Sequence, residues 1–129
     1  MLIVVNQWRI KPDKKSICAF LKHWRTVAIV GDRTALIAEF LSETRAPRDF
    51  PYITWHFDAD GLGDHKSYIT LGIWRDERAF HEQLGRKFDD TKKLLPFEKY
   101  RRRRVILSPD SWRLGGSSLP ARDHPPSIK

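Results

Sequence analysis

Asn6 is the residue whose chemistry most needs an explanation. It lies in the stretch LIVVNQWRI, residues 2–10, where most neighbours are apolar. The β-branched and aromatic types predict a strand, and each face of that strand starts apolar and carries a polar group further on, which is typical of a strand covered on both sides. A buried amide must find hydrogen-bond partners. Asn6 is therefore either a structural amide or one that positions a ligand, and the sequence leaves both interpretations open.

Two tryptophans are expected near this amide. Trp8 follows on the same strand, and Trp74 ends YITLGIW, residues 68–74, the clearest strand in the chain. The two strands are expected to be neighbours in the centre of a sheet. Trp24 shares the spacing of one helical face with Phe20, which favours a place in the core. Because aromatic walls hold flat apolar ligands, Trp8 and Trp24 are also candidate ligand-binding residues.

Other site chemistries have no matching pattern in the sequence. No group of His, Cys, Asp and Glu has the spacing of a metal site, and the stretch HFDAD, residues 56–60, is typical of a loop. A Ser–His–Asp order, a glycine-rich phosphate loop and a nucleophile elbow are also missing. We therefore predict neither a metal nor a cofactor.

Hydrophobic periodicity, helix caps and turn residues predict the elements that position these residues. A helix is expected from the N-cap Asp13 to about residue 30, and a second helix is expected after the N-cap Asp76. Residues 34–43 are expected to form a strand, with a short helix as the alternative, because Ala, Leu and Glu favour helices. The remaining expectations are a strand at 100–108, an extra strand or extended excursion at 52–58, a short helical piece at 90–95, and an extended or disordered tail.

This β-α-β, insertion, β-α-β order predicts an α+β fold of the ferredoxin-like, split β-α-β type, with an antiparallel sheet and helices on one face. We expect one domain over residues 1–112, with an insertion at about 44–66 and a tail at 113–129. The strands carry apolar residues on both sides, so the bare face of the sheet should be covered. A second copy is the simplest cover, which predicts a homodimer.

Four consecutive arginines, Arg101 to Arg104, raise the question of nucleic acid. In a strand Arg101 and Arg103 point one way, and Arg102 and Arg104 the other, so they cannot line one surface. Two are expected to face solvent or the helices, and two a dimer partner. The carboxylates expected to pair with the two arginines on the dimer side include Glu39, Glu43 and Asp76. The aromatic signature of a ferredoxin-like RNA-binding module is absent, so nucleic-acid binding is not favoured.

Composition sets the outer limits. The chain has 129 residues, 40% of them hydrophobic and 31% charged, as in a globular domain. Its net charge of +8 allows attraction to polyanions without specifying any. No apolar run is long enough for a membrane span. With one cysteine no internal disulfide can form, and a cytoplasmic location is the simplest expectation.

Three stretches together resemble the antibiotic biosynthesis monooxygenase family: VVNQWRIKP, YITLGIWRDERAF and RRRRVIL. The most specific piece is GIWRDERAFHEQ, a strand that ends in Trp followed by a helix that opens with AF. The resemblance covers roughly residues 1–108 and implies a dimeric α/β barrel in which two ferredoxin-like sheets pack face to face. The family includes cofactor-independent oxygenases, haem-degrading enzymes and proteins without assigned activity, so the fold does not settle the function.

The aromatic oxygenases of this family use an Asn and a Trp on the third strand and a Tyr in the next helix. Trp74 matches the Trp, whereas Thr70 stands at the Asn position and Phe80 at the Tyr position. The haem-degrading members use an Asn, a Trp and a His. Asn6 matches the first of these, but Gln83 and Lys93 occupy the other two positions, which argues against haem degradation.

These observations lead to an expected site and three alternatives for its function. The candidate catalytic residues are Asn6, Thr70 and Trp74, and the candidate ligand-binding residues are Trp8, Trp24, Phe80 and Gln83. The first hypothesis is a cofactor-independent monooxygenase that acts on a flat aromatic or quinone-like molecule. The second is a protein that binds a small apolar ligand, or only dimerises, without catalysis. A basic nucleic-acid module is the third. The sequence leaves open whether the protein is an enzyme.

Overall fold

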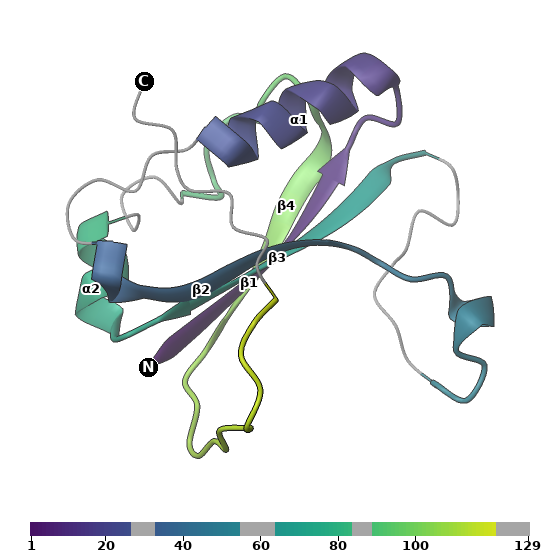
Figure 1. The fold of residues 1–129 in the computed structure, drawn as a ribbon. Helices are drawn as coiled ribbons and strands as arrows, with labels where there is room; N and C mark the ends of the chain where they lie inside the picture. The colour runs from purple at the N-terminus through teal and green to yellow at the C-terminus, as the bar shows by residue number, and fades with distance from the viewer. Residues whose placement is uncertain (27–32, 55–63, 84–88, 121–129) are drawn as a thin grey trace.

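A computed structural model describes residues 1–26, 33–54, 64–83 and 89–120 (Figure 1). The main elements, in chain order, are strand β1 (Leu2–Ile10), helix α1 (Lys14–Thr26), strand β2 (Leu36–Glu43), strand β3 (Lys66–Trp74), helix α2 (Glu77–Gln83) and strand β4 (Glu98–Leu107). Single 3-10 turns occupy Arg33–Ala35 and Pro47–Asp49. The predicted order of the main strands and helices is confirmed.

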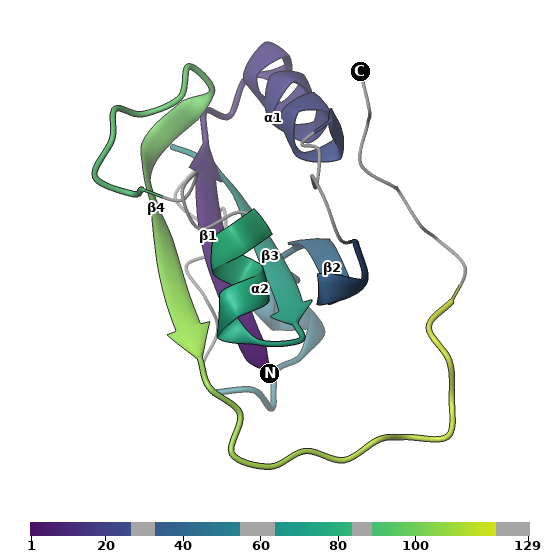
Figure 2. The ribbon, with the colours of Figure 1, turned by 90° about the vertical axis from the view of Figure 1, so that its left-hand side faces the viewer.

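The four strands form one antiparallel sheet in the order β2-β3-β1-β4. The two helices lie on the same face of this sheet, and the opposite face has no helix among the described residues (Figures 1 and 2). The architecture is α+β and compatible with a ferredoxin-like fold. Central strands β1 and β3 pair directly, so Trp8 and Trp74 lie on neighbouring strands as predicted. Neither described helix is long and apolar enough to cross a lipid bilayer.

The helix-facing side of the sheet holds two separate apolar clusters. The cluster under α2, here called the α2 cluster, contains Leu2, Val4, Ala35, Trp74, Ala79 and Phe80. The cluster under α1, here called the α1 cluster, contains Trp8, Ile10, Phe20, Tyr68 and Phe97. All five β1 residues at even positions from 2 to 10 are buried, as a strand with one face on the core requires. The residue between the two clusters on this face of β1 is Asn6.

Both helices begin at the predicted caps. The Ser16 backbone N–H donates to a carboxylate oxygen of Asp13 at 2.8 Å, and the Ala79 backbone N–H donates to Asp76 at 2.7 Å. These bonds also stabilise the ionised carboxylates and lower the pKa of both aspartates. The predicted end of the first helix, near residue 30, lies outside the described residues.

The helical piece predicted over residues 90–95 is wrong. Asp89 instead accepts hydrogen bonds from the backbone and hydroxyl of Thr91, at 2.9 and 2.5 Å, which is an Asx-type turn. Arg101 donates to the backbone carbonyls of Asp90 and Lys92. A helix would use those carbonyls internally, so the arginine contact holds this segment as a loop.

The strand boundaries differ slightly from prediction, and the two irregular regions are only partly described. β3 begins at Lys66 and β4 at Glu98, each before the predicted start. Residues 52–54 of the possible extra strand form no strand, and the rest of that stretch lies outside the described residues. Residues 108–120 contain no helix or strand.

The α1 cluster depends on Phe20, which is 0% exposed and whose ring lies 5.1 Å from that of Trp8 and 5.0 Å from that of Tyr68. We expect Phe20→Ala to lower the free energy of unfolding by about 3–5 kcal/mol, because a large cavity opens among aromatic rings. Urea denaturation followed by far-UV circular dichroism measures this change. Lys22→Ala, on the exposed side of the same helix, is the matched control. Equal stability of the two variants would contradict the assignment of Phe20 to the core.

Candidate functional site

A hydrogen-bonded pair, Asn6 and Thr70, lies at the middle of the helix-facing side of the sheet. The two residues face each other across the β1–β3 ladder, and the Asn6 amide donates to the Thr70 hydroxyl oxygen at 3.1 Å. They are only 6% and 5% exposed. The indole N–H of Trp8 donates to the same hydroxyl oxygen at 3.2 Å. The structure thus brings together three of the predicted site residues.

The hydrogen bonds that the Thr70 hydroxyl can still form follow from those it already makes. A hydroxyl oxygen has two acceptor positions and one proton. Both acceptor positions are filled by Asn6 and Trp8, so only the proton is left to donate. Among the described ranges of the chain, neither this proton nor the second amide N–H of Asn6 has an acceptor. The pair therefore presents donors only.

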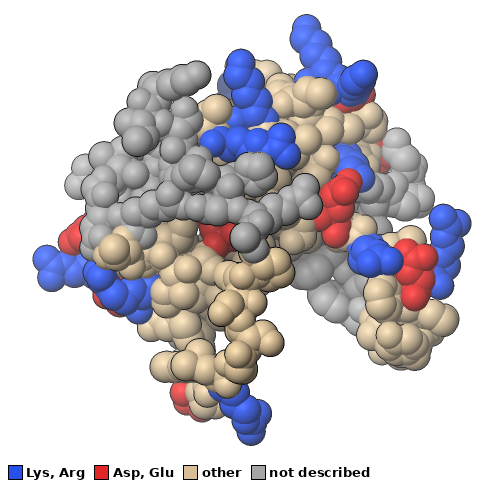
Figure 3. Space-filling view, in the orientation of Figure 1, with Lys and Arg blue, Asp and Glu red and all other residues tan. Residues whose placement is uncertain are grey.

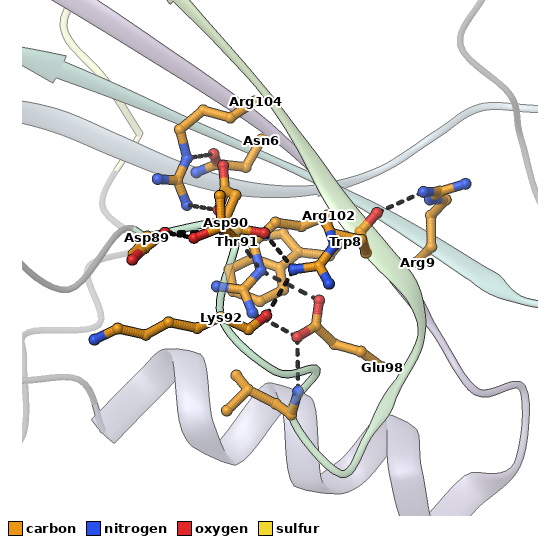
Figure 4. Close-up of polar contacts among 12 residues, drawn as sticks. Asn6, Trp8, Arg9, Asp89, Asp90, Thr91, Lys92, Glu98, Arg102 and Arg104 are labelled. Carbon is orange, nitrogen blue, oxygen red and sulfur yellow. Dashed lines mark hydrogen bonds and ion pairs between the residues drawn. The ribbon is translucent and has the colours of Figure 1, made fainter.

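Arg104 completes the pair and was not predicted as a site residue. It is the register partner of Asn6 on β4, and its Nε donates to the Asn6 side-chain oxygen at 2.5 Å (Figure 4). A terminal guanidinium nitrogen also lies 3.0 Å from a carboxylate oxygen of Asp90, in an ion pair that lacks the alignment of a hydrogen bond. The Arg104 side chain is only 8% exposed. Alternation along the strand predicts only that Arg104 shares a side with Arg102, whereas the β1–β4 register identifies its neighbour.

Burial lowers the pKa of Arg104, and the nearby Asp90 carboxylate partly opposes this effect. Arginine nevertheless remains protonated in proteins, so the guanidinium is a permanent positive charge beside Asn6. We refer to Asn6, Thr70 and Arg104 together as the donor centre. It combines one full charge with two polar donors at the surface of the sheet.

Arg102 connects the donor centre to the α1 cluster. Its guanidinium carbon lies 4.8 Å from the centre of the Trp8 ring, and one of its nitrogens lies 2.5 Å from Glu98. The Glu98 side chain is 0% exposed and also accepts from the Leu95 backbone N–H at 3.0 Å. A buried carboxylate needs such partners, because an unpaired charge would be very unfavourable. The Glu98 carboxylate therefore joins Arg102 of β4 to the Leu95 backbone of the preceding loop.

The predicted alternation holds for Arg102, Arg103 and Arg104, but a register shift opposite Trp8 interrupts it at Arg101, whose guanidinium contacts Asp90 and Lys92 of the preceding loop. Arg102 and Arg104 point toward the helix side, where they use Glu98 and Asp90. The expected carboxylates have other positions: Glu39 and Glu43 lie on β2, and Asp76 caps α2 and contacts Arg75. Within one copy, β2 and β4 are opposite edges of the sheet, so pairing of these carboxylates with the arginines across a dimer stays a prediction.

The outward charges do not form a single basic surface in the view of Figure 3. Lys and Arg side chains appear there at separated places, with Asp and Glu between them. Two of the four consecutive arginines are also held inside by carboxylates. Neither observation favours a phosphate-binding groove, which requires adjacent exposed cations.

Trp74 and Phe80 belong to the α2 cluster and are 1% and 6% exposed. Their rings pack at 5.6 Å in a T-shaped arrangement. A Cβ on Gly72 would lie 3.1 Å from the Trp74 indole nitrogen, so the indole lies over this glycine, between Trp74 and Thr70 along β3. The small residue leaves room for the indole nitrogen over β3, on the side of Thr70 opposite Trp8.

The other two candidate ligand-binding residues lie on the helices. Trp24 is half-buried on α1. Gln83 is the last residue of α2, and its side chain lies outside the described part of the chain. In the described ranges, no group of three or more His, Cys, Asp and Glu side chains is placed to hold a metal ion.

Comparison with known proteins adds no assignment. No family model matches the chain, and no curated protein is significantly similar to it. The function must therefore be argued from the donor centre and its surroundings.

Thr70 can be tested by an isosteric change. We expect Thr70→Val to destabilise the fold by about 1–3 kcal/mol for each buried donor left without an acceptor, here the amide of Asn6 and the indole of Trp8. Thr70→Ser keeps the hydroxyl and is expected to remain close to the original stability. Urea denaturation of the three proteins makes the comparison. A stable Thr70→Val variant together with a destabilised Thr70→Ser variant would show that packing of the methyl group, rather than the hydroxyl oxygen, is what matters.

His23 provides a pH test on α1. Its ring lies 5.3 Å from Phe97, and its pKa is lowered below 6.5, first by burial and then by the positive charge of Arg102. The unfolded chain therefore binds a proton that the folded chain resists, so this contribution to stability is complete above pH 6.5 and is lost as the pH falls through the lowered value.

We expect thermal melts between pH 7 and pH 5 to show a falling midpoint, and His23→Gln to flatten this dependence. The exposed His81 on α2 supplies the control variant, His81→Gln, which should retain the slope. An unchanged slope in the His23 variant would exclude His23 as its source. The aspartates that cap the helices titrate at lower pH and do not affect this window.

Proposed function

We propose that the protein binds a flat, electron-rich aromatic molecule at the donor centre and promotes its reaction with dioxygen without a cofactor. The observation that carries the proposal is the convergence of Asn6, Thr70 and the Arg104 charge: the side-chain acceptor atoms of Asn6 and Thr70 are engaged, while each of these two residues keeps a donor hydrogen. Such a set matches a ligand oxygen that bears or develops negative charge. The two indoles, Trp8 and Trp74, lie on opposite sides of Thr70 and supply flat apolar surface.

The donor centre holds hydrogen-bond donors and a positive charge, but its side chains include no general base, and this limits the chemistry it can support. Asn, Thr, Trp and Arg do not exchange protons near neutral pH, so the substrate must itself ionise readily, as a phenol or enol does. The donors would favour its anion by stabilising the negative oxygen. The carbanion form then transfers electrons to dioxygen. A methylene becomes a carbonyl, one oxygen atom enters the product, and the other leaves as water with the two methylene hydrogens.

The protein's part in this reaction is to orient and to stabilise. Asn6 is held from two sides, by Thr70 and Arg104, so its amide is preorganised instead of free to rotate. Arg104 supplies a charge that needs no proton transfer. The resemblance to the monooxygenase family supports the same reaction class.

We also propose a homodimer in which the open faces of two sheets meet and close an α/β barrel. Exposed apolar side chains on this face support it, among them Phe40, Val105 and Leu107, which are 37%, 52% and 45% exposed. The single cysteine, Cys18, is an exposed free thiol, which supports a reducing compartment such as the cytoplasm.

Non-catalytic binding of the same ligand class is the second candidate. The observation that favours it is that every polar side chain of the donor centre is engaged by another, without a titratable group in contact with Thr70. Binding without turnover would appear as quenching of tryptophan fluorescence with no oxygen uptake.

An oxygen electrode tests the reaction directly with a panel of hydroxylated anthrones. We expect uptake of one O₂ per molecule of product, and a fall of kcat by about 10²–10³ in Arg104→Leu, the typical effect of losing one oxyanion donor. Arg103→Leu, the exposed neighbour on the same strand, is the matched control and should retain the rate. Arg104→Lys should restore part of it.

Circular dichroism and thermal melts must show that each variant is folded. Absence of both oxygen uptake and fluorescence quenching across the panel would refute the proposed ligand site. Quenching alone would select the non-catalytic candidate.

A further inference from the structure

The face of the sheet opposite the helices has two apolar rows that cross all four strands. In each row the residues are direct register partners on β2, β3, β1 and β4. The first row is Ala38, Ile73, Ile3 and Leu107, and the second is Phe40, Leu71, Val5 and Val105. The inner members are partly buried by their neighbours, while Phe40, Val105 and Leu107 remain widely exposed. A continuous apolar surface of this kind is typical of an interface.

A second exposed apolar surface lies on residues 108–120, which we call the arm. It leaves the sheet directly after Leu107, at the end of the first row. Figure 1 shows the arm on the side of the sheet away from α1, and Figure 2 shows it running from the β4 edge toward the β2 edge. Trp112, Leu114 and Leu119 are 61%, 91% and 66% exposed, so the arm does not pack on its own sheet.

The size of the open face indicates why an arm is needed. Strands about 4.8 Å apart and rows about 7 Å apart give the two rows a footprint of roughly 300 Å². A stable protein interface buries about 800 Å² on each partner. The two apolar rows alone therefore fall well short, and a partner must also cover surface beyond them.

We propose that the arm grips a second copy of this chain, so that two open faces meet and each arm crosses onto the other copy. This rests on the proposed dimer and adds the segment that secures it. A second copy is the occupant that uses both exposed apolar surfaces of the chain, and a two-fold axis makes each contact twice. Trp112 is the expected anchor, because buried aromatic residues dominate the energetics of interfaces.

Sedimentation equilibrium of the full chain tests the proposal. We expect the full chain to be a dimer. The double variant Trp112→Ser with Leu114→Ser should raise the dissociation constant of this dimer at least tenfold, and so should truncation of the chain after Leu107. The double variant changes only exposed residues of the arm and leaves the folded sheet intact. Ser117→Ala with Ser118→Ala, in the same arm, is the control and should change nothing.

The outcomes separate the arm from the dimer. If both changes to the arm leave the dimer equally tight, the proposed role of the arm is wrong but the dimer is retained. In that case Val105→Glu, on the open face, should still dissociate the dimer. A monomeric full chain would overturn both. The salt dependence of association identifies the partner. Two chains of charge +8 repel each other, so added salt should maintain or strengthen a dimer. Loss of association with added salt would point to an acidic partner and refute the proposal.

Discussion

The structure depends on one hydroxyl oxygen, that of Thr70, which accepts N–H groups from two side chains of the neighbouring strand. It lies between two apolar clusters, where an unpaired amide or indole N–H would be costly. Because the hydroxyl satisfies both, the middle of the core can hold polar groups while the strands on either side stay closely packed. Without it, Asn6 would have to turn away or be replaced by an apolar residue.

Arginine plays two different roles within a single strand. Arg102 and Arg104 enter the core from the edge of the sheet, and each is matched by a carboxylate from the adjoining loop or strand end. Arg103 faces the other way and is exposed. The positive net charge of the chain therefore overstates what its surface offers to a polyanion, because part of that charge is neutralised inside. Composition alone could not separate these roles, since it ignores direction.

The sequence predicted what depends on local pattern and missed what depends on register. Spacing within short windows predicts the helix caps at Asp13 and Asp76, the strands, and the pairing of the strand that carries Trp8 with the strand that carries Trp74. Arg104 could not be assigned to the site from the sequence, because its neighbour depends on the register between β4 and β1. The false helix at 90–95 has a similar origin: Arg101 lies beyond that segment and captures its carbonyls. Tertiary contacts overrode local propensity there.

The contact between Arg104 and Asn6 joins residues 98 positions apart in the sequence. Almost the whole domain must be synthesised before this contact can form, and closing so long a loop is among the slower steps of folding. The first strand thus emerges from the ribosome with a polar group whose charged partner arrives only with the last strand. Completion of the sheet and assembly of the donor centre are consequently one event, and an incompletely folded chain cannot display the chemistry of the finished one.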